Sequence, residues 1–204
     1  MTEKLVTKQP ARREAAVRGL LGAAWALMAR EGVAALSVRQ LARDVGLRQQ
    51  SVTYYFPTKQ DLLDALFADG FRALRPLLVD AGGAGRPMER LVATVDALLG
   101  YCVGHPARYH LMLQRTVPGF TPSEAAHEVA LGTLAVLLER LADAGVTRPQ
   151  DVVAVRGLIN GLAAEQIAND PGGRSYVSQA GRALRALLAG LALDPSTGIP
   201  PTRE

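Results

Sequence analysis

The sequence predicts an all-α fold of about nine helices. Apolar side chains recur three and four residues apart through most of the 204 residues, which is the spacing of one face of a helix. No segment shows the alternation of apolar and polar residues expected of a strand, and glycines and prolines separate the helical segments. Hydrophobic residues make up 49% of the chain, so a packed core is expected and disorder is excluded for most of its length.

The first two expected helices have well-marked ends. The first helix closes at Gly32, and the second opens at Ser37, whose side chain can cap it. Gln40, three residues later, stands where it would complete a capping box. Gly46 ends the second helix, because a sharp turn favours a left-handed backbone there. The apolar stripe of the first helix consists of Val17, Leu20, Leu21, Ala24, Leu27 and Met28.

The stretch GLRQQSVTYYFPTK, residues 46–59, is rich in β-branched and aromatic residues that favour a strand, yet it lies between two helical segments. We expect a short third helix with Val52 inward, and helical geometry then places Arg48, Tyr55 and Phe56 on the same side. The opposite face presents amide, hydroxyl and phenol groups: Gln50 and Tyr54, flanked by Ser51 and Thr53, with Gln49 near the edge.

Two helices of about eight residues joined by Gly46 and Leu47 have the dimensions of a helix-turn-helix. The polar face suits a DNA major groove, where a glutamine amide both donates to and accepts from the edge of adenine. A threonine methyl can meet thymine, and hydroxyl groups can reach bases or phosphates. The alternative is an ordinary short helix with a polar face.

The remaining segments are also expected to be helical. Thr58 starts the fourth helix with Asp61 in the capping-box position, and Pro76 should kink or end it. A flexible connection at 81–87 precedes a helix at about 87–103. His105 and Pro106 break the pattern before a short helix at 107–116 and a loop at 117–122. Long helices then fit residues 123–144, 150–169 and 174–192.

Charge is distributed unevenly along the chain. Residues 1–60 hold ten Lys and Arg against four acidic residues, a net +6, so the remainder of this +4 chain carries −2. A basic N-terminal quarter indicates contact with a polyanion, although a solvated basic face would explain the charge alone. The single Cys102 excludes an internal disulfide. No apolar run is long enough to span a membrane and no secretory signal begins the chain, so we expect a cytoplasmic protein without a membrane partner.

Residues 23–66, AAWALMAREGVAALSVRQLARDVGLRQQSVTYYFPTKQDLLDAL, resemble the DNA-binding domain of the TetR family of transcriptional regulators. The resemblance rests on order and spacing: a helix ending in Glu-Gly, Ser37 leading an amphipathic helix, Gly46, a Tyr-Tyr-Phe ending, and a Pro-Thr-Lys step into the next helix. It implies that residues 48–55 enter the major groove, that Lys59 contacts phosphate, and that Arg39 lies near the DNA backbone. The family often has Ser or Thr where this chain has Arg48, and Tyr where it has Thr53, so the phosphate role may be carried by Tyr54 or Arg48. The implied DNA-binding residues are Ser37, Arg39, Arg48, Gln49, Gln50, Ser51, Thr53, Tyr54 and Lys59.

The resemblance also implies a domain order. A flexible arm is expected at 1–9, the helix-turn-helix domain at 10–57, an effector-binding and dimerisation domain at 58–192, and a flexible tail at 193–204. For dimerisation, small residues align on one helix and leucines on the next, although these faces could instead meet within one subunit. The expected interface residues are Gly157, Gly161, Ala164, Ala168, Leu184, Leu187, Leu188 and Leu191.

A cavity for a hydrophobic or amphipathic effector is implied in the central helices. Most of its candidate residues could equally be plain core. The apolar and aromatic candidates are Phe71, Tyr101, Tyr109, Met112, Leu113 and Phe120, and the polar anchors are Asn160 and Gln166.

No pattern indicates an enzyme, a metal site or a cofactor. The three histidines and one cysteine lack the spacing of a zinc site, and a single Glu124-Ala-Ala-His127 step is half of a di-iron motif. The sequence therefore predicts a homodimeric, ligand-responsive repressor on a palindromic operator. A non-specific DNA-binding protein is the alternative, disfavoured by the −2 charge of residues 61–204.

Overall fold

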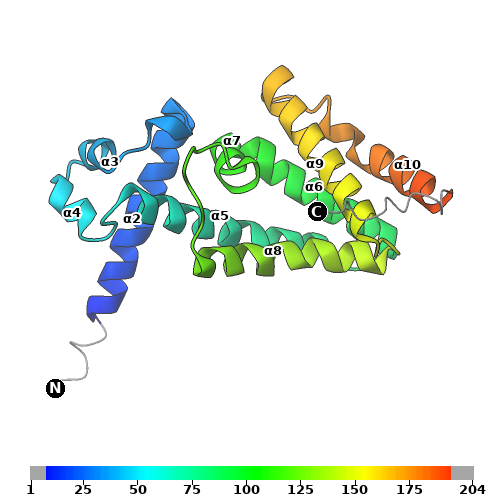
Figure 1. The fold of residues 1–204 in the computed structure, drawn as a ribbon, viewed down its shortest axis with the longest axis horizontal. Helices are drawn as coiled ribbons and strands as arrows, with labels where there is room; N and C mark the ends of the chain where they lie inside the picture. Colours follow the sequence, from blue (N-terminus) through cyan, green and yellow to red (C-terminus); the bar gives the residue numbers. More distant parts are fainter. Residues whose placement is uncertain (1–7, 194–204) are drawn as a thin grey trace, which may run out of the picture. The chain divides into compact units, whose positions relative to one another are not determined.

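The computed structural model describes residues 8–193, and within them it contains nine α-helices and no strand, which confirms the all-α prediction (Figure 1). The predicted arm and tail lie outside the described residues, except for residues 8, 9 and 193, which belong to helices. Contacts divide the chain into two compact units, Met1–Ala73 with His105–Thr133 and Leu74–Gly104 with Leu134–Glu204. The predicted boundary at residues 57 and 58 stays a prediction.

The first unit begins with the long helix α2 (Lys8–Glu31), on which the helix-turn-helix is built. A 3₁₀ turn, η1 (Val33–Ala35), leads to α3 (Val38–Asp44) and then to α4 (Gln49–Thr53). Figure 1 shows these two short helices in blue and cyan beside α2. The core that they share consists of side chains at most 7% exposed: Leu20, Leu21, Ala24, Leu27, Met28, Leu41, Val52 and Phe56.

The ends of α3 follow the sequence closely, with one difference. Ser37 caps the helix, because its Oγ accepts from the Gln40 backbone nitrogen at 3.1 Å. The Gln40 amide does not return the bond and donates to Asp44 Oδ1 at 3.4 Å, so only half of the capping box forms. Gly46 has φ 66°, and Leu47 N donates to Ala42 O at 2.9 Å, which is the bond that closes a Schellman motif.

Helix α5 (Lys59–Ala81) begins with a complete capping box. Thr58 N donates to Asp61 Oδ2 at 2.9 Å, and Asp61 N donates to Thr58 Oγ1 at 3.1 Å. The prediction that Pro76 might end this helix is wrong, since α5 continues to Ala81. Packing of the surrounding turns outweighs one lost backbone bond: Leu74 and Leu78, on either side of Pro76, are fully buried.

The segment predicted as one short helix at 107–116 is irregular. Helix α7 (Pro106–Tyr109) passes directly into a π-helical turn, η2 (His110–Gln114), and Arg115 ends it with a left-handed φ of 51°. The turn lies close to α5, because a Cβ on Gly70 would collide with the sulfur of Met112. Helix α8 (Glu124–Asp143) follows after a loop, as predicted.

The second unit is organised around α6 (Pro87–Gly104), which packs on α9 (Pro149–Asn169) and α10 (Ala180–Leu193). The last helix begins at Ala180, after a 3₁₀ turn η3 (Val177–Gln179), and not at residue 174. The cause lies in Gln166 of α9, whose Oε1 accepts from Tyr176 N at 3.0 Å and from Val177 N at 3.2 Å. These bonds hold the chain in a turn before α10 can start.

Replacing Gly46 by Ala should lower the free energy of unfolding by about 1 kcal/mol, because the left-handed backbone disfavours a Cβ although the surrounding space is open. Gly22, exposed in the middle of α2 with equally open space, is the matched control. Gly22→Ala should raise stability by about 0.5–1 kcal/mol. Urea unfolding followed by circular dichroism would measure both, and a stabilising Gly46→Ala would contradict the assignment of the turn.

Candidate nucleic-acid interface

The short helix α4 is held by two buried side chains and presents polar ones. Val52 is completely buried and Phe56 is 4% exposed, so both anchor the segment in the core. Gln49, Gln50 and Ser51 are exposed. Tyr54, at 72% exposure, is the most exposed of the large hydrophobic side chains in the described chain. Five residues of helix thus turn amide, hydroxyl and phenol groups towards solvent, as the sequence predicted.

The neighbours of these groups are more constrained. Thr53 is half-buried and its Oγ1 donates to the Gln50 carbonyl at 3.1 Å, so its hydroxyl is already bonded within α4. The rings of Tyr54 and Tyr55 meet edge to face with centroids 5.0 Å apart, which limits the freedom of Tyr54. Arg48 was expected on the same side as Val52, but it is exposed, since it stands before the helix with extended backbone.

Positive charge collects around α4 because the acidic residues nearby are already paired. Arg30 binds Asp44 at 2.6 Å and Glu31 at 2.9 Å. The pKa of Arg30 is raised, chiefly by the hydrogen bond with Asp44. Within residues 8–193, no ion pair takes up the exposed basic residues of this region, which are Arg39 and Arg43 on α3, Arg48 before α4, and Lys59 at the start of α5.

Two of these positions bear on the predicted contacts. Ser37 is committed to its cap and half-buried, so its hydroxyl is less available than the sequence indicated. Arg43 was not among the predicted DNA-binding residues, yet it is exposed four residues after Arg39 on the same helix. That spacing, which places two residues on one helical face, was the signal in the sequence.

Helix α2 is tied to the rest of the first unit by Trp25. Its indole Nε1 donates to Asp69 Oδ2 of α5 at 2.8 Å. The guanidinium of Arg108, from α7, lies over the ring at 5.0 Å from its centroid. Sequence reasoning missed this cluster, because its three members are far apart along the chain and each is unremarkable alone.

The predicted ligand-binding residues divide between the two units. Phe71, Tyr109, Met112 and Phe120 are buried in the first unit, where Leu113 is half-buried. Tyr101, Asn160 and Gln166 belong to the second unit. The amide nitrogen of Gln166 donates to the backbone carbonyl and the side chain of Asp170, and its oxygen accepts two further bonds. Gln166 therefore serves the loop after α9, and a ligand would have to compete with those four bonds.

The predicted interface residues differ in exposure. Gly157, Gly161 and Ala168 are exposed, Ala164 is half-buried, and a Cβ on either glycine would meet no atom within 4 Å. Val153, on the same face of α9, is 64% exposed. Leu184 is completely buried within its own unit, so it is not available to a second chain. The other predicted leucines of α10, which are Leu187, Leu188 and Leu191, are half-buried.

Two further classes of site were searched for in residues 8–193. That part of the chain holds no group of three or more His, Cys, Asp or Glu side chains placed to share a metal ion. Its single cysteine, Cys102, is buried, and burial raises the pKa of its thiol to about 12. Among the helices described, none combines the length and the apolar character needed to cross a bilayer.

Comparison with known proteins gives a family and a fold. The family described as bacterial regulatory proteins, tetR family, matches residues 20–66, which contain the helix-turn-helix. HTH-type transcriptional regulators of Mycobacterium tuberculosis and Mycobacterium bovis are 29% identical over 115 residues, which is 54% of this chain and 49% of each relative. The chain thus spans about half the length of the curated relatives it matches.

Solved structures resemble the fold over most of the chain. A tetR-family transcriptional regulator from Streptomyces coelicolor aligns with a TM-score of 0.70 at 21% identity, over 89% of this chain and 84% of that one. The TetR family regulator PfmR from Thermus thermophilus gives 0.60 at 23%, over 84% and 98%. A TetR variant from Acinetobacter baumannii, in complex with minocycline, gives 0.60 at 19%, over 86% and 95%. At these identities the likeness establishes the fold alone.

Replacing Trp25 by Phe should lower the free energy of unfolding by about 1–3 kcal/mol, because the part-buried Asp69 carboxylate loses its donor. Asp69→Asn is the matched comparison, since an asparagine oxygen can still accept from the indole, and it should cost less. Circular dichroism must follow the urea unfolding, because Trp25 is the only tryptophan. Equal stability of Trp25→Phe and the parent protein would show that this contact carries no weight.

Proposed function

From the premise that the chain belongs to the TetR family of bacterial transcriptional regulators, we propose that it is a homodimeric repressor that binds a palindromic operator and responds to a small molecule. The family is not enzymatic, which agrees with the expectation of no catalytic role. The observation that carries the proposal is the presentation of α4: its anchors Val52 and Phe56 are buried, while Gln49, Gln50 and Tyr54 are exposed beside unpaired basic residues.

The division of labour on this surface follows from its chemistry. Exposed amide and phenol groups on α4 can form specific hydrogen bonds with base edges in the major groove. Arg39, Arg43 and Lys59 lie on α3 and at the start of α5, and their charges suit phosphate oxygens, which fix position without reading sequence. In addition, the backbone N–H groups of the first turn of α5 favour an anion at that end.

A dimer is supported by the outward face of α9. Val153, Gly157, Gly161, Ala164 and Ala168 lie on one side of that helix, and none of them carries a charge. Their small side chains would let a second helix approach closely. A helix-turn-helix dimer reads two half-sites about one helical turn of DNA apart, which is why a palindromic operator is proposed.

An effector response is supported by the connection of α2 to α5 and α7. Trp25 holds both helices to the helix-turn-helix domain through Asp69 and Arg108. A molecule that binds better to one arrangement of these helices shifts the population towards it. A coupling free energy of about 1.4–2.8 kcal/mol would change operator affinity by about 10- to 100-fold. The buried aromatic residues of the first unit favour a hydrophobic or amphipathic effector, and cytoplasmic DNA is the expected target.

The experiment that tests the proposal is selection of bound fragments from a random duplex library by the purified protein. Salt of about 150 mM suppresses non-specific binding. An enriched inverted repeat is expected, and it would define the operator. Bound fragments without a common sequence would favour the non-specific DNA-binding alternative.

Tyr54→Ala and Gln50→Ala should each reduce discrimination among bases by about 1–3 kcal/mol at the contacted position. Lys59→Ala should weaken binding to all sequences and reduce the salt slope by about one. Competition binding on the selected operator and its single-base variants, between about 50 and 200 mM salt, separates the two effects. A change of preferred base caused by Lys59→Ala would contradict this division of roles.

Gly157→Leu should raise the dissociation constant of the dimer about 10-fold or more, because a large side chain would separate the two facing helices. The protomer itself has open space there. Gly100→Leu, on an exposed part of α6 with equally open space, is the control and should leave assembly unchanged. Sedimentation equilibrium would compare them, and an unaltered dimer in Gly157→Leu would place the interface elsewhere.

A further inference from the structure

A groove runs along one side of α10 in the second unit, formed by two adjoining hollows of about 400 Å³ each. Both volumes are in the range of small-molecule sites. Ala144 lines both hollows, so they meet at this residue. On α10 the groove follows Arg185, Leu188 and Leu191, which recur every three residues. None of the residues predicted to bind an effector lines either hollow.

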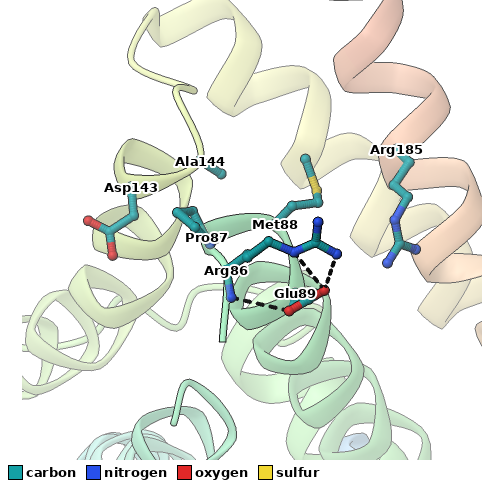
Figure 2. A pocket seen from close by; sticks show the side chains of 7 residues that line it. All are labelled: Arg86, Pro87, Met88, Glu89, Asp143, Ala144 and Arg185. Carbon is teal, nitrogen blue, oxygen red and sulfur yellow. Dashed lines mark hydrogen bonds and ion pairs between the residues drawn. The ribbon is translucent and has the colours of Figure 1, made fainter. Parts of the chain in front are cut away.

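The first hollow presents a guanidinium without an ionic partner. Figure 2 shows Arg185 facing Arg86 and Glu89 across the hollow. Glu89 Oε1 accepts from Arg86 Nε at 3.0 Å, and its Oε2 accepts from Arg86 N at 3.2 Å. These bonds lower the pKa of Glu89, so its carboxylate is ionised and neutralises Arg86. Arg185 donates to the carbonyl of Gly181 at 3.1 Å and forms no ion pair within the described chain.

The other carboxylates near this hollow do not cancel that charge. Asp143 lies between Arg90 at 3.4 Å and Arg140 at 3.6 Å, and in Figure 2 it points away from Arg185. Asp96 of α6 lies in the field of Arg185 and of a second arginine, and partial burial raises its pKa. Guanidinium groups therefore outnumber carboxylates here: Arg86, Arg90, Arg140, Arg174 and Arg185 against Glu89, Asp96 and Asp143.

The second hollow is apolar apart from one neutralised pair. Val146, Leu188 and Leu191 contribute aliphatic walls. Arg148 Nε binds Asp151 Oδ2 at 2.7 Å, and Arg148 Nη2 donates to the Leu191 carbonyl at 3.0 Å. Because these charges compensate each other, the hollow attracts neither ion strongly. The groove is thus basic at one end and mainly apolar at the other.

We propose that this groove binds a monoanionic amphiphile, an unbranched alkyl chain with a carboxylate head such as a medium-chain fatty acid. The head lies between Arg86 and Arg185, and the alkyl chain passes Ala144 towards Leu188 and Leu191. A planar guanidinium suits a carboxylate, and the apolar walls remove the chain from water. The inference concerns binding alone, so it does not depend on the proposed operator recognition.

Isothermal titration of the full-length protein with hexanoate, octanoate and decanoate, each below its micelle concentration, tests the site. Affinity should rise up to about 4-fold for each methylene group that the groove buries. Decyltrimethylammonium, which has the same chain and the opposite charge, should not compete with decanoate. Absence of decanoate binding by the folded protein, or equal binding of the cationic compound, would overturn the proposal.

Two variants locate the ligand. Arg185→Gln should weaken decanoate binding about 10-fold or more, whereas Arg182→Gln, at an exposed arginine of the same helix outside the groove, should not. Ala144→Leu should fill the junction of the hollows, so that decanoate binds no better than hexanoate. Thermal unfolding by circular dichroism verifies that each variant is folded. Equal affinities of Arg185→Gln and Arg182→Gln would place any bound fatty acid elsewhere.

Discussion

The burial of Val52 and Phe56 is the constraint on which the candidate interface depends. A helix of five residues has no stability of its own in water, because helix nucleation costs more than so few backbone bonds return. The strand-like composition of α4 adds to this cost. Its shape therefore comes from the core beneath it, where both anchors are almost completely enclosed. The exposed glutamines and Tyr54 are positioned only as well as these two side chains are packed.

That core is in turn positioned by α2, which supplies most of its apolar side chains and also carries Trp25. One face of the helix packs on α3 and α4, while the indole bonds to α5 and lies under an arginine of α7. A shift of α5 or α7 that breaks the bond to Asp69 must either move α2 or leave a part-buried carboxylate without its donor. This is a physical reason to expect coupling within the first unit, and it needs no flexible hinge.

Local rules predicted the elements well wherever a single short segment decides the outcome. Ser37, Gly46 and the Thr58–Asp61 pair end or begin helices as the sequence indicated. Prediction failed where distant residues decide: α5 continues through Pro76 because its neighbours are buried, and α10 starts late because Gln166 binds the chain before it. The same limit applies to the site, since exposed polar residues of α4 were predictable but the Trp25 cluster was not.

Helix α10 illustrates how one amphipathic segment can serve two surfaces. With Leu184 completely buried, helical geometry puts Arg185 and Leu188 on one side of it and Leu187 on the other. The groove occupies the first side, which leaves Leu187 and the uncharged face of α9 as the surfaces suited to a second subunit. A leucine stripe alone could not separate these roles, because all four leucines look alike in sequence. The arginine within the stripe, beside two hollows that share Ala144, is the feature that distinguishes them.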